Sequence, residues 1–218
     1  DRATAPRVDR FVAISRHVQT RIRDFYGRDS DVVYPPANTD YFTPGAETRG
    51  GHDFLISAMV PYKRVDIAIR AYTQSGHPLR VMGTGSGLEE LKRIAGPNIT
   101  FLGRQPDEAL RGEYRACRFL LFPGEEDYGI VPVEAMACGT PVIAYRKGGA
   151  TETVLEGETG YFFDQQTPEA LWRAVEDAAK RDWDPERIRE RALDFGEQPF
   201  IDGLGAVIRE VTTSAPGG

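Results

Sequence analysis

Two acidic side chains, Glu126 and Glu134, lie on either side of Gly129 in the sequence. Residues 117–122 form a short apolar run, which is typical of a buried parallel strand. Gly129 then begins an apolar segment with helical character that ends at Gly139. This pattern predicts one carboxylate in a loop and the other a turn or more into the following helix.

The start of this helix is a suitable place for an anion. The first amides, at Gly129 and Ile130, have no helical acceptor, and the helix dipole favours negative charge there. Hydroxyls at the two ends of a bound diphosphate could donate hydrogen bonds to Glu126 and Glu134. A nucleoside diphosphate sugar has this layout of ribose, diphosphate and sugar. The alternative is that both acids are ordinary helix-start charges, which are favourable by themselves.

Lys63 and Arg64 follow another predicted strand, at residues 54–59. A cation here would neutralise a diphosphate and would stabilise the charge that develops on a leaving group. The alternative is a solvated pair at a helix start. Because cations are slightly unfavourable at that end of a helix, we expect an anion nearby, and we favour Lys63 for the role.

Alternating strands and helices must position these residues. Strands are expected at residues 10–15, 31–34, 54–59, 79–82, 99–102, 117–122, 141–145 and 160–163. Helices are expected at residues 16–26, 65–72, 88–94, 106–116, 129–137, 151–155, 167–180, 185–193 and 201–212, with Ser15 and Thr167 as N-caps. This order predicts an α/β fold, a Rossmann-like parallel sheet with helices on both faces.

Loops that leave the carboxyl ends of parallel strands line one rim of such a sheet, where ligands bind. The predicted rim loops are residues 61–64, 83–87, 103–105, 123–127 and 146–149. Their convergence favours the binding interpretation of the acidic loop.

Residues 37–52 are polar and rich in Gly, Pro and Thr, which indicates a linker. The preceding residues are too few for a domain of their own. We therefore expect residues 1–50 to be the end of a preceding domain with its crossover, and residues 51–197 to be the nucleotide-binding domain. Residues 198–218 would be a last helix and a tail, disordered from residue 213. The chain starts at Asp1 without methionine, which is consistent with a fragment.

Composition excludes several classes of protein. The net charge of −6 argues against nucleic acid or an anionic membrane as the main partner. No run of residues is long and apolar enough for a membrane span. Cys117 and Cys138 lie in apolar surroundings, as expected for reduced core thiols of a cytosolic protein. Histidines and cysteines have no zinc-site spacing, and we expect no metal.

Two other chemistries are disfavoured. The glycine loop at residues 83–87 lacks the G-x-G-x-x-G spacing of a dinucleotide site, so close turning of the backbone explains it better. Glycoside hydrolysis needs two acids that face one bond. Glu126 and Glu134 would instead bracket a helix start, which favours ligand binding.

Residues 123–142, PGEEDYGIVPVEAMACGTPV, resemble the E-x7-E signature of family 4 glycosyltransferases. Residues 34–42, 60–69, 98–103 and 148–160 are similar to the same family, in the same order along nearly the whole chain. The resemblance implies the GT-B fold, in which two Rossmann-like domains face each other across a cleft. The C-terminal domain binds the nucleotide sugar and the N-terminal domain binds the acceptor.

The resemblance implies a retaining, metal-independent transfer, with a role for each part of the loop. Glu126 would lie near the donor sugar, Glu134 on the ribose diol and Lys63 on the diphosphate, so that Glu126 and Lys63 are the expected catalytic residues. The other expected donor-binding residues are Arg64, Gly103, Arg104, Asp127, Tyr128, Gly129 and Ile130, with Gly103 and Arg104 near the base.

Two departures limit the resemblance. Many members carry an Arg-Leu pair where this chain has Ala58 and Met59, so one phosphate cation is missing unless Arg64 replaces it. The acceptor domain is almost absent. A lone donor half should bind the nucleotide sugar weakly and transfer the sugar poorly, since both walls of the cleft between the two domains are needed to position the reacting groups.

The resemblance further implies a GDP- or UDP-linked hexose such as mannose as donor, and a glycan or lipid-linked acceptor, as in polysaccharide assembly. The sequence of residues 60–66, VPYKRVD, is similar to that of mannosyltransferases that use a GDP sugar. The expected location is cytoplasmic, at the inner face of a membrane if the missing domain attaches there. Two alternatives stay open: a sugar-nucleotide-binding module without turnover, and a sugar-nucleotide 2-epimerase on the same fold.

Overall fold

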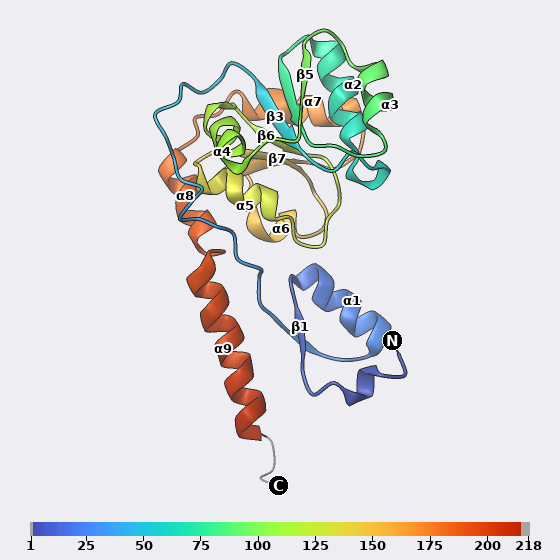
Figure 1. The fold of residues 1–218 in the computed structure, drawn as a ribbon, viewed down its shortest axis with the longest axis vertical. Coiled ribbons are helices and arrows are strands. Elements are labelled where there is room, and N and C mark those ends of the chain that lie inside the picture. The colour runs from blue at the N-terminus through green and yellow to red at the C-terminus, as the bar shows by residue number, and fades with distance from the viewer. Residues whose placement is uncertain (1, 215–218) are drawn as a thin grey trace.

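The computed structural model describes residues 2–214 and is built on a six-stranded parallel sheet (Figure 1). Its strands lie in the order β5-β4-β3-β6-β7-β8. The chain enters in the middle with β3, builds outward through β4 and β5, then returns to the other side of β3 with β6. The strands are β3 (Asp53–Ile56), β4 (Leu79–Met82), β5 (Ile99–Gly103), β6 (Leu120–Phe122), β7 (Val142–Tyr145) and β8 (Gly160–Phe163).

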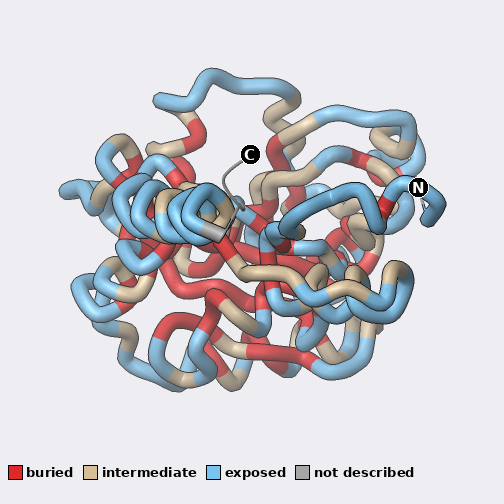
Figure 2. The backbone as a smooth tube through the Cα atoms, turned by 90° about the horizontal axis from the view of Figure 1, so that it is seen from below, coloured by how far each residue is buried: buried red, intermediate tan, exposed pale blue. Residues whose placement is uncertain are grey.

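Helices cover both faces of this sheet, as the sequence predicts. One hydrophobic core packs under α4 (Asp107–Ala116), α5 (Ile130–Ala137) and α8 (Pro185–Leu193). The other packs under α2 (Val65–Ser75), α3 (Leu88–Ile94) and α7 (Pro168–Ala178). Because both faces are covered, β6 and β7 are buried at every residue, and buried backbone gathers inside the body (Figure 2). A short helix, α6 (Ala150–Thr153), follows β7.

A buried carboxylate joins the two halves of the sheet at the ends of the strands opposite the rim loops. Asp53, at the start of β3, is fully buried. It accepts hydrogen bonds from the Tyr72 hydroxyl at 2.5 Å, from Arg118 Nε at 3.0 Å and from the Phe119 amide at 3.1 Å. These contacts link β3 to α2 and to the segment that enters β6, so they hold together the two strands whose loops form the candidate site.

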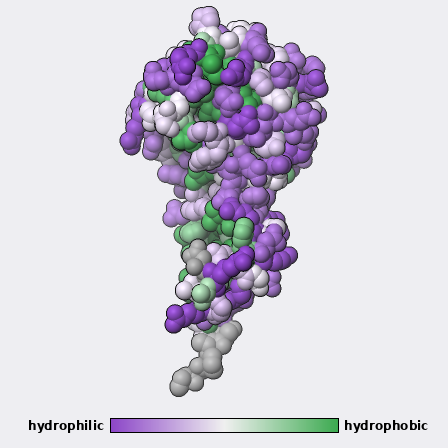
Figure 3. Space-filling model, turned by 90° about the vertical axis from the view of Figure 1, so that its right-hand side faces the viewer, coloured by the Kyte–Doolittle hydropathy of each residue, from purple (hydrophilic) through white to green (hydrophobic). Residues whose placement is uncertain are grey.

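The N-terminal residues form a separate βαβ unit. It consists of β1 (Phe11–Ala13), α1 (Arg16–Tyr26) and β2 (Ser30–Val32), and its two strands pair in parallel. Both strands are shorter than predicted. Ser15 caps α1 as predicted, since its Oγ accepts the Val18 amide at 3.0 Å. Hydrophobic residues of this unit are exposed, among them Val12 and Phe25, and hydrophobic surface is visible on the narrow lower part of the molecule (Figure 3).

The crossover between the two parts has no regular structure but is firmly held. Arg111 donates to the Tyr41 carbonyl at 3.2 Å, and Arg115 donates to the Thr43 carbonyl at 2.7 Å. Arg49, which belongs to the crossover itself, donates to the Gly139 carbonyl at 2.8 Å, just beyond the end of α5. The predicted linker is therefore a strap fixed along α4 and α5, and composition alone did not reveal this.

The last helix, α9 (Glu197–Ser214), is longer than predicted and projects from the body beside the N-terminal unit (Figure 1). Arg10, the residue before β1, lies 3.1 Å from Glu210 and ties this helix to the N-terminal unit. The predicted disorder from residue 213 is wrong for Thr213 and Ser214, which are helical; residues 215–218 lie outside the described residues. The sequence also did not predict two 3-10 helices, η1 (Ala5–Arg7) and η2 (Pro61–Lys63).

Two other features of the described residues bear on the predictions. Cys117 and Cys138 are buried and form no disulfide, as predicted. Within residues 2–214, no helix is both long and apolar enough to cross a membrane.

Asp53→Asn should lower the free energy of unfolding by about 3 kcal/mol, because it leaves Arg118 without its buried anionic partner. Urea denaturation at neutral pH measures this loss. Glu89→Gln, which removes an exposed pair with Lys92, is the matched control and should cost less than about 0.5 kcal/mol. Equal effects of the two substitutions would contradict the linking role of Asp53.

Candidate functional site

The candidate site lies where the strand order reverses, between the carboxyl ends of β3 and β6. The chain leaves β3 and makes one 3-10 turn, η2, that ends at Lys63. Arg64 then adopts a left-handed conformation with φ of 52°, which is rare for a residue other than glycine. This reversal lets α2 begin at once and keeps Lys63 at the rim.

Glycines shape the loop that leaves β6. Gly129 has φ of 83° where α5 begins, and a Cβ there would lie 2.8 Å from Phe122 Cζ. Gly148 has φ of 68°, and a Cβ there would lie 2.2 Å from the Glu126 carbonyl oxygen. The neighbouring Gly149 donates its amide to that same carbonyl at 2.8 Å. The loop after β7 therefore packs against the backbone of the acidic loop, and only glycine fits at this contact.

Lys63 and Glu126 form an ion pair in which Nζ lies 2.5 Å from Oε2. Their side chains are only 16% and 23% exposed. The predicted phosphate cation and the predicted sugar-binding acid thus neutralise each other across the reversal point. An anionic ligand that bound Lys63 would have to replace this carboxylate.

Glu134 lies in the interior of α5 and is mostly enclosed. Burial raises its pKa to about 7, and Asp107 at the start of α4 acts in the same direction. A hydrogen bond from the Tyr114 hydroxyl, 3.0 Å from Oε2, acts in the opposite direction and lowers the pKa. A carboxyl group whose pKa is raised this far towards neutral pH is typical of functional sites.

A recess of about 580 Å³ opens at the acidic loop. Its walls come from α1, from η2 and its exit, from the acidic loop and from the segment after β8; the lining residues are His17, Arg21, Tyr62, Arg64, Glu125, Glu126, Asp127 and Gln166. Asp127 lies 2.5 Å from Arg21 Nη1 and 3.9 Å from His17 Nε2. The predicted donor-binding carboxylate of Asp127 therefore already has a cationic partner on α1.

The remaining predicted residues divide between the rim and the interior. Arg64 lines the recess and lies 3.2 Å from Asp66 and 3.4 Å from Gln166. Ile130 is exposed at the first turn of α5. Gly103 ends β5 with φ of 67°, and Arg104 is exposed beside it on the same rim. These positions agree with a shared rim but leave the predicted roles untested.

The side chain of Tyr128 lies outside the recess. Its ring is buried, with centroids 5.8 Å from Tyr34 and 6.4 Å from Phe195, so it packs towards the crossover and does not line the recess. Only its backbone borders the start of α5. A tyrosine in a polar loop did not indicate this, because the aromatic partners come from distant parts of the chain.

The sequence interpretation assigned no role to Glu152, which joins the N-terminal unit to the rim. Its carboxylate accepts the amides of Arg16 at 2.8 Å and His17 at 2.9 Å, at the start of α1. It also accepts the Tyr34 hydroxyl at 2.8 Å. An anion at a helix start is favourable, so this contact sets how α1 faces the acidic loop. Glu152 lies within a segment that resembles the family, which was the available signal.

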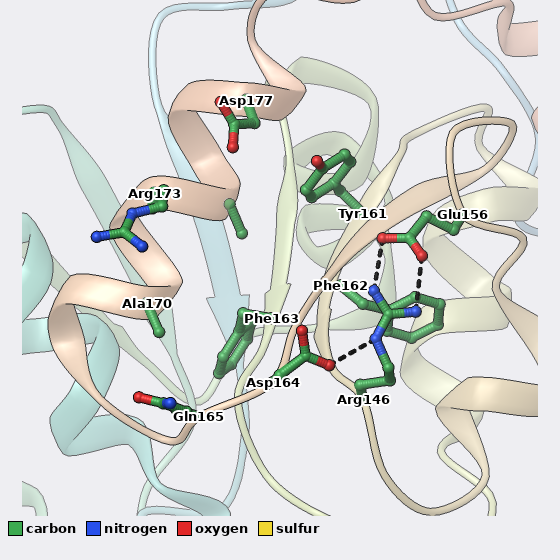
Figure 4. Close-up of a pocket in the computed structure, with 11 residues that line it drawn as sticks. Arg146, Glu156, Tyr161, Phe162, Phe163, Asp164, Gln165, Ala170, Arg173 and Asp177 are labelled. Carbon is green, nitrogen blue, oxygen red and sulfur yellow. Dashed lines mark hydrogen bonds and ion pairs between the residues drawn. The ribbon is translucent and has the colours of Figure 1, made fainter.

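A second hollow, of about 310 Å³, lies between β8 and α7 and contains none of the predicted site residues (Figure 4). Arg146 in this hollow is 2.6 Å from Glu156 and 2.7 Å from Asp164, so two carboxylates already neutralise it. Across the described part of the chain, no group of three His, Cys, Asp or Glu side chains could hold a metal ion.

Glu134→Gln should stabilise the protein at alkaline pH. Because the native pKa of about 7 exceeds the usual 4.5, the native state holds a proton that the unfolded state has lost, and stability falls as pH rises between these values. The variant lacks this fall. Relative to the parent it should gain about 3 kcal/mol at pH 8 and nearly nothing at pH 4.5, measured by urea denaturation.

The control for this measurement is Glu125→Gln, which changes an exposed acid of the same region. This exposed substitution should change the free energy of unfolding by less than about 0.5 kcal/mol. A difference for Glu134→Gln that is equally small at both pH values would contradict the buried, hard-to-ionise carboxylate.

Comparison with known proteins identifies the family of this chain. The family model for glycosyl transferases group 1 matches residues 54–195. The chain is 33% identical to a D-inositol 3-phosphate glycosyltransferase from Rhodococcus erythropolis, over 90% of this chain and 52% of the relative. It is 31% identical to a GDP-mannose-dependent alpha-(1-6)-phosphatidylinositol monomannoside mannosyltransferase from Mycolicibacterium smegmatis, over 75% of this chain and 51% of the relative.

Solved structures show the same fold. Sucrose-phosphate synthase from Thermosynechococcus elongatus superposes with a TM-score of 0.85 at 24% identity, over 98% of this chain and 61% of that one. HepE from Anabaena in complex with UDP gives 0.82 at 22% identity, over 95% and 66%. The chain spans about half the length of the curated relatives described above. Because the family model covers most of it, the chain belongs to the group 1 glycosyltransferases.

Proposed function

We propose that this chain is the donor-binding half of a retaining glycosyltransferase that takes a hexose from a nucleoside diphosphate sugar. The observation that carries the proposal is the meeting of Lys63 and Glu126, 2.5 Å apart, at the reversal point of the sheet and beside the start of α5. A cation and a helix start together favour a diphosphate. The UDP complex of HepE, which has the same fold, supports a nucleotide ligand.

In the proposed arrangement the diphosphate takes the place of Glu126 as the partner of Lys63. Lys63 and the first amides of α5 then stabilise the charge that develops on the leaving diphosphate, without a metal. Glu126, released from the lysine, accepts hydrogen bonds from sugar hydroxyls. Glu134 accepts hydrogen bonds from the ribose diol. Each carboxylate thus binds one end of the donor.

The donor that we propose to test first is GDP-mannose, since one relative is named as GDP-mannose-dependent. A UDP-linked hexose is the second choice, because HepE is solved with UDP. We propose a glycan or lipid-linked acceptor. We place its recognition in a separate N-terminal domain that faces the recess, and we propose that the enzyme works in the cytoplasm, at the inner face of a membrane.

A second candidate is a binding module without turnover. It is favoured by the ion pair in which Lys63 holds Glu126, because an acid held by this cation is not free to take part in transfer. Transfer requires both walls of the cleft. Product analysis with the full-length protein and a set of lipid-linked acceptors separates the two functions, since the binding module would release no nucleoside diphosphate.

Calorimetric titration of the folded chain with GDP-mannose, UDP-glucose and ADP-glucose tests the donor site. We expect one of the three to bind, and Lys63→Ala to weaken that binding about 10- to 100-fold through loss of a charged hydrogen bond. Lys92→Ala, a change of an exposed lysine on α3, is the control. Absence of binding for all three at millimolar concentration would overturn the proposal.

Glu126→Ala should separate the two ends of the donor. Removal of this acid leaves Lys63 without its partner, so the affinity for free GDP or UDP should rise about 3- to 10-fold. The gain in affinity that the sugar adds over the free nucleotide should disappear. Glu89→Ala, which removes an exposed acid on α3 outside the recess, is the control. A loss of affinity for the free nucleotide in Glu126→Ala would contradict the exchange of partners at Lys63.

A further inference from the structure

We infer that Tyr114 is a positioning residue of the donor site: its hydroxyl holds one carboxylate oxygen of Glu134, so that the other oxygen is left for the vicinal hydroxyls of a ribose. This inference rests on the proposed function, because it assumes that Glu134 receives the ribose. Tyr114 lies on α4, outside the acidic loop and outside α5, so the motif of the acidic loop does not include it.

The hydroxyl of Tyr114 has little freedom to move. Tyr114 is fully buried on α4, and its ring meets Phe42 and Phe54 edge-on, with centroids 5.6 Å and 5.8 Å away. Its carbonyl accepts a hydrogen bond from Thr140. Phe42 belongs to the crossover strap and Phe54 to β3, so two other parts of the fold hold this ring in place on α4.

The hydrogen bond from Tyr114 favours the ionised form of Glu134. The rest of α5 carries no charge, and Asp107 of α4 raises the pKa of Glu134. The cations packed against α5 gather at its C-terminal end: Arg189 of α8 donates to the Ala137 carbonyl and Arg49 of the crossover to the Gly139 carbonyl, and Arg111 and Arg115 of α4 act with them on the pKa of Cys138. Among residues 2–214, Glu134 forms no ion pair, and the Tyr114 hydroxyl is the hydrogen-bond donor to its carboxylate. Burial raises the pKa of Tyr114 well above its ordinary value, so the hydroxyl stays protonated and remains a donor throughout the neutral range.

The hydrogen bond from Tyr114 uses Oε2 of Glu134. Oε1 has no hydrogen-bond partner within the described residues, so it remains an acceptor for a ligand. An ionised carboxylate accepts hydrogen bonds at both oxygens, whereas the protonated acid gives up part of this capacity. Binding of a ribose diol should therefore strengthen as Glu134 loses its proton, at a pH near 7 in the parent protein.

Tyr114→Phe keeps the ring and removes the donor. We expect the midpoint of the pH dependence of nucleotide-sugar affinity to move up by about 0.5 to 1 pH unit, because the hydrogen bond favours the ionised acid. Affinity should fall about 3- to 10-fold at pH 7 and recover to within about 2- to 3-fold at pH 8.5. Calorimetry with GDP-mannose and UDP-glucose measures both, since their phosphate groups are diesters that stay ionised over this range.

The matched control is Tyr72→Phe. It also removes a buried tyrosine hydroxyl that donates to a carboxylate, 2.5 Å from Asp53, but at the opposite ends of the strands. It should lower stability and leave the affinity and its pH midpoint unchanged. Carbon-13 NMR of the Glu134 carboxyl in the ligand-free protein gives a second measurement, in which Tyr114→Phe should raise the titration midpoint by the same amount.

The outcomes distinguish this inference from the proposed function. If the parent binds no nucleotide sugar, the proposed function fails and this inference fails with it. If the parent binds but Tyr114→Phe loses the same factor at every pH, or the carboxyl midpoint stays in place, Tyr114 has only a packing role and the inference alone is overturned. An upward shift in both measurements, absent in Tyr72→Phe, supports it.

Discussion

The reversal of strand order between β3 and β6 is the constraint on which the rest of the structure depends. Adjacent parallel strands whose connections run in opposite directions leave a crevice at their carboxyl ends, since no crossover covers that point. The loop after β3 brings Lys63 there, and the loop after β6 brings Glu126. Their ion pair is thus a consequence of topology. Asp53 holds the opposite ends of the same two strands together, so the crevice has a rigid base.

Charge is unevenly compensated around this crevice. Glu126 has Lys63, Asp127 has Arg21, and Arg64 has Asp66. Among residues 2–214, the partner of Glu134 is the neutral hydroxyl of Tyr114, and burial raises the pKa of Glu134 to about 7. A carboxylate in this situation costs stability when it is ionised. Such a cost is common where a group is held ready for a ligand, and it separates Glu134 from the acids that ordinary ion pairs stabilise.

Contacts from outside the sheet complete the site. The crossover strap places Phe42 against Tyr114, and Arg49 of the same strap binds the Gly139 carbonyl beyond α5. Glu152 caps the start of α1 and so turns Arg21 towards the acidic loop. The recess therefore has walls from both the sheet domain and the N-terminal unit.

The sequence by itself determined the fold class, the order of the elements and the rim loops that carry Lys63 and Glu126, because apolar periodicity, glycines and caps act over a few neighbouring residues. The N-caps Ser15 and Thr167 are examples, and both are confirmed. The tertiary structure alone decided which groups pair. Four features depend on residues far apart in the chain: the Lys63–Glu126 ion pair, the packing of the Tyr128 ring, the hydrogen bond from Tyr114 and the capping of α1 by Glu152. Such partners depend on side-chain packing across elements, which local patterns do not encode.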